Sequence, residues 1–305
     1  MTPEARLRWA RTLLWVTPAL WSSNYIIARA ANGMIAPHLL ALGRWALALA
    51  LMLPFVWREI AANAPHWRGE WRQMLVLGAL GMWVCGAFVY IGAQSTSATN
   101  IGLIYAATPV GIALVSRWVL HETTTRTQRA AMALALCGVL FVIAKGSLAN
   151  LLAVRFVAGD GWIVLASLAW VAYSVLQQRW PSVLGARARL ACITAGGLLV
   201  LLPFTLVEQA FAPGPALSLQ AMLLVVLAGV LPGFLSYQAY AIMLSELGAT
   251  RSSLVMYLSP IYAAASAWWL LGEAPQAYHL VGALLILPSI FLATRGPARA
   301  EPPSR

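Results

Sequence analysis

The sequence predicts an all-α polytopic membrane protein with ten transmembrane helices, arranged as two inverted five-helix repeats. Three observations support this prediction: a very apolar composition, long apolar runs separated by short polar connections, and a likeness between the two halves of the chain. Of the 305 residues, 61% are hydrophobic and only 10% are charged, and the mean hydropathy is +0.77. Soluble domains carry about 25% charged residues. Much of the surface of this protein is therefore expected to face hydrocarbon.

Ten apolar runs reach the length of about 17 to 25 residues that a membrane-spanning helix needs. In the first half they lie near residues 12–30, 39–57, 73–94, 99–119 and 127–145. In the second half they lie near 160–180, 188–208, 220–243, 250–271 and 277–294. The first run also resembles a cleavable signal peptide, but its length and the similar runs after it favour a first span. We expect four regions: a repeat at 1–146, a linker at 147–158, a repeat at 159–295 and a flexible cytoplasmic tail at 296–305.

The net charge of +11 raises the question of a nucleic-acid partner. The basic residues lie in short clusters between apolar runs, which is the distribution of a membrane protein that obeys the positive-inside rule. If both termini are cytoplasmic, the opposite side receives only Arg29, Lys145 and Arg155, and Arg44 lies within a span. We therefore predict a multi-pass protein of the bacterial inner membrane. It is expected to contact the lipid bilayer and to have no nucleic-acid partner.

The two halves of the chain match at residues that rarely coincide by chance. A shift of 151 positions pairs Pro109 with Pro260, Trp118 with Trp269 and Glu122 with Glu273; a shift of 149 pairs Trp21 with Trp170 and Glu59 with Glu208. Because five spans are an odd number, the second repeat must enter the membrane inverted. Inverted repeats are a common build for secondary transporters, whose binding site lies near the midplane between the halves. Transport is accordingly the leading functional hypothesis.

Several motifs of the chain resemble those of a known family. The stretch Ala19-Leu20-Trp21-Ser22-Ser23-Asn24-Tyr25, followed by Pro37 and Arg44, is similar to the opening of the EamA-type members of the drug/metabolite transporter superfamily. So are the blocks at 98–122 and 249–273. Within this superfamily the chain most resembles the YddG type of amino-acid exporter. The resemblance implies a ten-helix inner-membrane exporter of small metabolites, with amino acids, aromatic ones included, as its cargo.

Neutral polar and aromatic side chains in six spans are the candidate substrate-binding residues. The choice of these six spans follows the family resemblance. The candidates are Trp21, Asn24, Tyr25, Tyr90, Gln94, Tyr105, Thr108, Trp170, Tyr173, Ser174, Gln177, Tyr237, Tyr240, Tyr257 and Ser259. Such groups suit a small amphipathic solute, whose apolar part packs on aromatic rings and whose polar end forms hydrogen bonds. The alternative for each one is an ordinary interface anchor or packing residue.

Two prolines and one arginine add further hypotheses. Pro109 and Pro260 fall near the centres of their spans, where each removes a helix hydrogen bond and makes a kink or hinge. They are also consistent with a purely structural role. Arg44 either reaches outward to the membrane surface or contacts a substrate carboxylate.

Other functional classes have less support in the sequence. The glutamates fall at predicted helix ends, and the first span lacks the glutamate of the small multidrug relatives, which disfavours a multidrug or toxic organic-cation exporter. The sequence contains no pattern of a nucleophile, a metal ligand or a phosphate loop that would indicate an enzyme, a metal or a cofactor. It also contains no soluble appendage of the kind that would indicate a receptor. A single chain supplies both repeats, so we expect that a monomer suffices.

Overall fold

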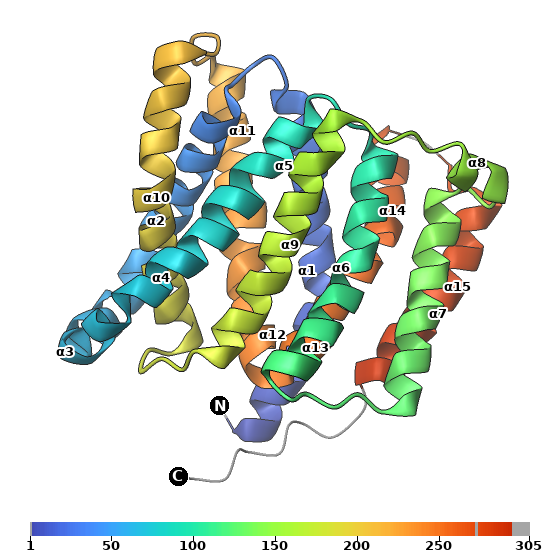
Figure 1. The fold of residues 1–305 in the computed structure, drawn as a ribbon, viewed down its shortest axis with the longest axis horizontal. Coiled ribbons are helices and arrows are strands. Elements are labelled where there is room, and N and C mark those ends of the chain that lie inside the picture. The colour runs from blue at the N-terminus through green and yellow to red at the C-terminus, as the bar shows by residue number, and fades with distance from the viewer. Residues whose placement is uncertain (1, 272–273, 295–305) are drawn as a thin grey trace.

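The computed structural model describes residues 2–271 and 274–294, and all regular structure within them is helical (Figure 1). The long helices lie roughly side by side in one bundle. The start of α1 (Pro3–Ala31) and the end of α15 (Ala277–Thr294) lie at the same end of that bundle. The expected tail at 296–305 lies outside the described residues.

The first half contains five long helical stretches. After α1 come α2 (Pro37–Ala62), the stretch from α3 to α5, α6 (Ala98–Val119) and α7 (Arg126–Ile143). The third stretch consists of α3 (Ala64–Trp67), η1 (Arg68–Glu70), α4 (Trp71–Gly78), η2 (Ala79–Val84) and α5 (Cys85–Ala93). The starts follow local chemistry: proline occupies the first turn of α1 and α2, and Thr125 and Gln128 form a capping box at α7.

The second half repeats this order after the short helix α8 (Leu148–Leu152). It contains α9 (Ala158–Arg179), α10 (Ala186–Phe211), α11 (Leu219–Ala228), η3 (Gly229–Leu235), α12 (Ser236–Leu247), α13 (Ala249–Ser253), η4 (Leu254–Leu258), α14 (Ser259–Leu271) and α15. Helix α1 and its counterpart α9 run in opposite directions in the bundle (Figure 1).

Among the described residues, eight helical stretches are long and apolar enough to cross a membrane, as in a multi-pass membrane protein. They are Pro37–Ala62, Ala64–Ala93, Ala98–Val119, Arg126–Ile143, Ala158–Arg179, Ala186–Phe211, Leu219–Leu247 and Ala277–Thr294. Helix α1 and the run from α13 to α14 are not in this group, so the number ten stays a prediction. Large apolar side chains such as Phe55, Trp118 and Phe211 are mostly exposed on the outside of the bundle, where lipid would cover them.

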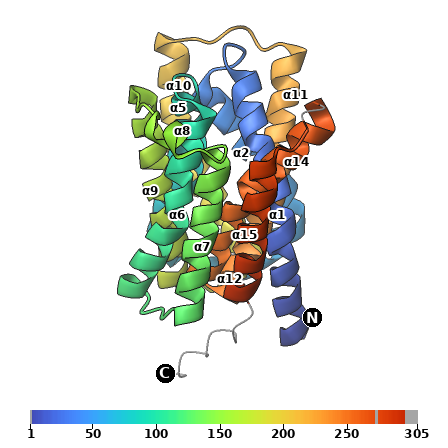
Figure 2. The same ribbon diagram turned by 90° about the vertical axis from the view of Figure 1, so that its right-hand side faces the viewer.

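The main helix contacts join the two halves to each other. Helix α2 packs on α10, α1 on α12, α6 on α9, and α7 on α15 at one side of the bundle (Figure 2). The approach of α10 to α4 is so close that a Cβ atom at Gly78 would lie 2.2 Å from the backbone nitrogen of Gly197. Glycine at these positions therefore permits backbone-to-backbone packing between the halves.

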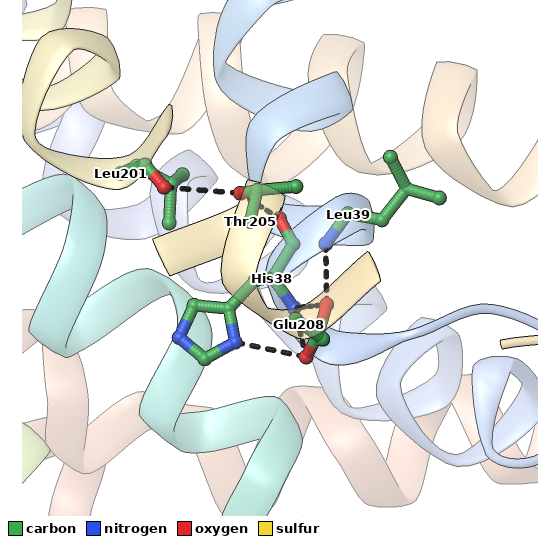
Figure 3. A network of polar contacts seen from close by, with 5 residues as sticks. All are labelled: His38, Leu39, Leu201, Thr205 and Glu208. Carbon is green, nitrogen blue, oxygen red and sulfur yellow. Dashed lines mark hydrogen bonds and ion pairs between the residues drawn. The ribbon is translucent and has the colours of Figure 1, made fainter. Parts of the chain in front are cut away.

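Helices α2 and α10 also cap each other's first turns. The Glu208 carboxylate accepts hydrogen bonds from the backbone N–H groups of His38, at 2.9 Å, and Leu39, at 3.1 Å, and it lies 2.8 Å from His38 Nδ1 (Figure 3). At the other end of the pair, Glu59 accepts from the N–H of Gly185 at 2.7 Å. Since Glu59 and Glu208 correspond in the repeat, the two contacts are reciprocal. Each carboxylate satisfies N–H groups that a helix start leaves free.

Two stretches depart from the regular α-helix at nearly equivalent positions. Segments η2 and η3 are wound as π-helix; η2 follows Gly78 and η3 begins at Gly229, and a shift of 151 positions pairs these two glycines. A third departure corrects an expectation about Pro260. It is the second residue of α14, after the 3₁₀ segment η4, rather than the centre of a continuous helix. A missing N–H costs little there. Pro109, by contrast, lies inside the continuous helix α6.

Candidate functional site

A cavity lies between the two halves, among residues of α1, α2, α5, α6, α9, α12, η4 and α14. The volume of this cavity is about 80 Å³. The lining residues are Trp21, Asn24, Arg44, Cys85, Val89, Tyr105, Trp170, Tyr237, Met256 and Ser259. Aromatic and aliphatic groups thus surround a few polar ones, which is the usual composition of a site for a small organic molecule.

Arg44 is the charged residue of this wall, and its side chain turns into the bundle. The residue is only 3% exposed, so the alternative in which it reaches the membrane surface does not hold in this structure. Nη1 donates to Asn24 Oδ1 at 3.2 Å and to Tyr90 Oη at 3.1 Å, and Nη2 donates to the backbone oxygen of Pro232 at 3.0 Å. The guanidinium also lies 4.5 Å from the centre of the Trp45 ring, at cation–π distance.

The buried charge of Arg44 has only neutral partners. Within residues 2–271 and 274–294, no carboxylate lies at ion-pair distance from Arg44, and its Nε atom is buried without a hydrogen-bond partner. A buried cation is costly unless it is paired. Arg44 is therefore prepared to bind an anionic group that enters the cavity, above all a carboxylate, which matches the guanidinium fork.

Asn24 and Tyr90 hold the guanidinium in place. The Tyr90 hydroxyl donates to Asn24 Oδ1 at 2.8 Å, and the same oxygen accepts from Arg44. These three side chains come from α5, α1 and α2. Both lone pairs of the Asn24 oxygen are thereby used, so this atom has no capacity left for a further donor.

An aromatic cluster, defined here as Trp21, Trp170, Tyr173, Tyr237 and Tyr240, borders the cavity. Trp21 and Trp170, which correspond in the repeat, pack edge to face with 5.4 Å between ring centres. Trp170 lies 5.2 Å from Tyr173 in a stacked arrangement and 4.9 Å from Tyr240. The Tyr240 hydroxyl shares a 2.8 Å hydrogen bond with Ser174. The two repeats therefore meet at aromatic rings, which give a flat apolar surface for a side chain.

The π segments supply backbone oxygens to this region. The Tyr237 hydroxyl donates to the oxygen of Gly81 at 3.1 Å, and Trp45 Nε1 donates to the oxygen of Met82 at 3.0 Å, both in η2. Arg44 contacts Pro232 in η3. A change from α to π winding interrupts the regular hydrogen-bond ladder and is frequent at functional sites. Side chains from each repeat thus bind backbone of the other.

Several expected site residues do not line the cavity. Thr108 shares a 2.7 Å hydrogen bond with Ser167, which joins α6 to α9. Gln94 is exposed at the end of α5, because the helix stops at Ala93. Tyr257 packs in a separate apolar cluster, and Gln177 is buried three residues beyond Ser174 without lining the cavity. The side chain of Tyr25 lies outside what the structure describes.

Four residues around the cavity were not expected from the sequence. Cys85, Val89 and Met256 line the wall as apolar neighbours, and Trp45 packs on Arg44. The three lining residues carry no signal that sets them apart in so apolar a chain. Trp45 did carry one, since an aromatic residue directly after an intramembrane arginine is a candidate for a cation–π contact.

The fold and this cavity define the class of a multi-pass membrane transporter. The model of the EamA-like transporter family matches the chain twice, over residues 8–144 and 157–295. The chain therefore belongs to the EamA-like transporter family, with a two-repeat build. Proteins of this family are transporters, which supports membrane transport as the role of this chain.

Named relatives agree with this class. The chain is 24% identical to an uncharacterized transporter of Archaeoglobus fulgidus, over 92% of this chain and 96% of the relative. It is 23% identical to an S-adenosylmethionine/S-adenosylhomocysteine transporter of Chlamydia trachomatis, over 90% and 86%. It is 24% identical to a probable terminal-alkyne amino-acid exporter of Streptantibioticus cattleyicolor, over 94% and 93%. One solved protein structure shares the fold, with a TM-score of 0.73, 19% identity and coverage of 93% and 96%.

Proposed function

We propose that this protein is a secondary transporter that exports small metabolites, foremost amino acids with aromatic or hydrophobic side chains, across the bacterial inner membrane. The chain would cross the membrane ten times, with α1 and the run from α13 to α14 as the two further spans. Both termini would be cytoplasmic, as the distribution of basic residues favours. The opposite directions of α1 and α9 support inverted repeats that alternate access to one central cavity.

One observation supports the cargo most directly. A buried arginine, with no carboxylate partner among the described residues, lies in the same cavity wall as Trp21, Trp170 and Tyr237. The guanidinium suits the carboxylate of an amino acid, and the aromatic rings suit an apolar side chain. The amino-acid exporter among the relatives is consistent with such a cargo. Export of organic cations is disfavoured, because the described cavity wall holds a positive charge and no acidic residue.

The test is a counterflow screen of amino acids with purified protein in liposomes, with and without a pH gradient. We expect uptake of labelled phenylalanine or leucine into liposomes that contain the unlabelled amino acid. Trp170→Ala should slow this uptake, because Trp170 forms part of the cavity wall and of the aromatic cluster. Trp118→Ala is the matched control, since Trp118 is 79% exposed on the outside of α6.

The result that would contradict the proposal is a folded protein that exchanges no amino acid in this screen. Equal flux in wild type and Trp170→Ala would remove Trp170 from the binding site. An accumulation that depends on the pH gradient would identify proton coupling, whereas simple exchange without it would identify facilitated transport.

A further inference from the structure

We propose that the cavity recognises the carboxylate of its substrate but not the ammonium group. Monoanionic carboxylates with an apolar or aromatic body, such as 2-hydroxy acids, are then substrates at least as good as the matching amino acids. This inference rests on the proposed function, because it names the substrate class of the same cavity.

The charged group of the described cavity wall is a donor, and neutral donors lie beside it. Arg44 presents a guanidinium whose Nε atom has no partner within the described residues. Trp21 carries an indole N–H group, which donates and never accepts. A carboxylate brings two acceptor oxygens and a negative charge, and it therefore matches both the donors and the charge.

Acceptors for an ammonium group are scarce in the same wall. The Asn24 oxygen already accepts from Tyr90 and Arg44. The Tyr237 hydroxyl donates to Gly81, and the thiol of Cys85 donates to the backbone oxygen of Ala166 at 3.1 Å, so each offers an ammonium group only neutral lone pairs. Neither an aspartate nor a glutamate is among the described lining residues. What remains is neutral, such as the Ser259 hydroxyl, and a buried cation needs more than a neutral hydroxyl to offset its desolvation.

Aromatic faces are the other groups that hold an ammonium, through cation–π contacts. In this cavity part of the aromatic surface is already in contact with other groups. The Arg44 guanidinium lies 5.8 Å from the centre of the Tyr237 ring. One face of Trp170 is stacked on Tyr173, and Trp21 meets the rings of Trp170 and Tyr237 edge to face. A second cation in this space would also be repelled by Arg44.

Charge balance leads to the same substrate class. A monoanion that pairs with Arg44 leaves the occupied cavity neutral, whereas a zwitterion leaves one positive charge without a partner. Uncompensated charge inside a bilayer is expensive, and it would oppose the rearrangement that moves the occupied site across the membrane. The neutral pair avoids this cost.

The test compares four ligands that share a benzyl group, on the detergent-purified full chain. Labelled 3-phenyllactate is bound to the wild-type protein at pH 7.5, and phenylalanine, phenylalaninamide and phenethylamine compete with it. Binding is measured rather than flux, because uncharged carboxylic acids leak through bilayers. We expect 3-phenyllactate to bind as well as phenylalanine or up to about tenfold tighter. The amide and the amine, which lack a carboxylate, should bind at least about tenfold more weakly.

The outcomes separate this inference from the proposed function. If phenylalanine is exchanged by the protein but 3-phenyllactate binds about tenfold more weakly than phenylalanine, the inference is overturned and the proposed function stands. If phenethylamine binds best, the carboxylate contact itself is wrong. If no ligand binds and no amino acid is exchanged, both the function and the inference fail.

A variant with an added carboxylate gives an independent test. Ser259→Asp places an anionic acceptor in the cavity wall, and we expect it to reverse the order, so that phenylalanine binds about tenfold better than 3-phenyllactate. Ser259→Asn, which has nearly the same shape, should keep the wild-type order. An unchanged order in folded Ser259→Asp would contradict the inference. The comparison in the wild-type protein decides the question if the variant does not fold.

Discussion

Loss of the Glu208 carboxylate is expected to weaken the packing of α2 on α10, and therefore the contact between the two halves of the protein. The carboxylate accepts from two backbone N–H groups in the first turn of α2 and lies beside the His38 ring in a partly buried site. A helix cap contributes about 0.5–2 kcal/mol, and a hydrogen bond to a charged acceptor about 1.5–3 kcal/mol. We therefore expect Glu208→Ala to cost about 2–3 kcal/mol of unfolding free energy.

Glu208→Gln separates the charge from the shape. One oxygen of Glu208 accepts from both His38 and Leu39, and a glutamine amide oxygen at that place keeps both bonds. The charge and the contact of the other oxygen with His38 Nδ1 are lost, while the two bonds to the helix start remain, so the expected cost falls to about 1 kcal/mol. The apparent melting temperature in detergent gives the order of the variants. It is followed by a thiol-reactive dye that labels the buried Cys192 on unfolding, in a Cys137→Ser background because Cys137 is exposed.

The control is a glutamate whose ion pair is exposed. Glu246 lies 3.7 Å from Arg6, whose side chain is 55% exposed, and such pairs contribute about 0–1 kcal/mol after solvent screening. Glu246→Ala should therefore melt close to the wild type, Glu208→Gln below it and Glu208→Ala lowest. A Glu208→Ala protein that melts together with Glu246→Ala would refute the capping argument.

Two more predictions concern the packing and the direction of the chain. In Gly78→Ala the new Cβ atom would lie 2.2 Å from a backbone nitrogen that cannot move aside, so we expect a loss of about 1–3 kcal/mol or failure of the protein to accumulate. Gly161→Ala, whose Cβ meets no atom within 4 Å, should leave the melting temperature unchanged or slightly higher. Reporter tags after Asn150 and at the C-terminus should report opposite sides of the membrane. Tags on one side would contradict the inverted repeats.

The long helices were predictable because apolar length and local caps determine them. The expected span at 99–119 nearly coincides with Ala98–Val119, and the one at 277–294 with Ala277–Thr294. The helix that contains the expected first span at 12–30 begins earlier, at Pro3, where Thr2 caps it. The break before Pro260 and the π winding of η2 and η3 were not predictable, because their glycines and proline also fit an ordinary packed helix.

The site was predictable only in part, for a related reason. The repeat itself indicated that Trp21 and Trp170 are central, and their rings are in contact. The orientation of Arg44 depends on Tyr90 and on the backbone oxygen of Pro232, which are far away in the sequence. No local pattern reports such partners. Thr108 was expected to line the site because it is a polar residue within a span. In the structure its hydroxyl forms a hydrogen bond with Ser167 instead of facing the cavity.

The central claim is that Arg44 binds the carboxylate of the cargo, and counterflow of phenylalanine and phenylalaninamide through wild type and Arg44→Gln tests it most directly. We predict that Arg44→Gln lowers phenylalanine exchange at least about tenfold at concentrations below saturation, because a buried charge pair is lost. Exchange of the amide, slow in both proteins, should change little. Equal loss for both ligands, in a variant that remains folded and monodisperse, would contradict the claim.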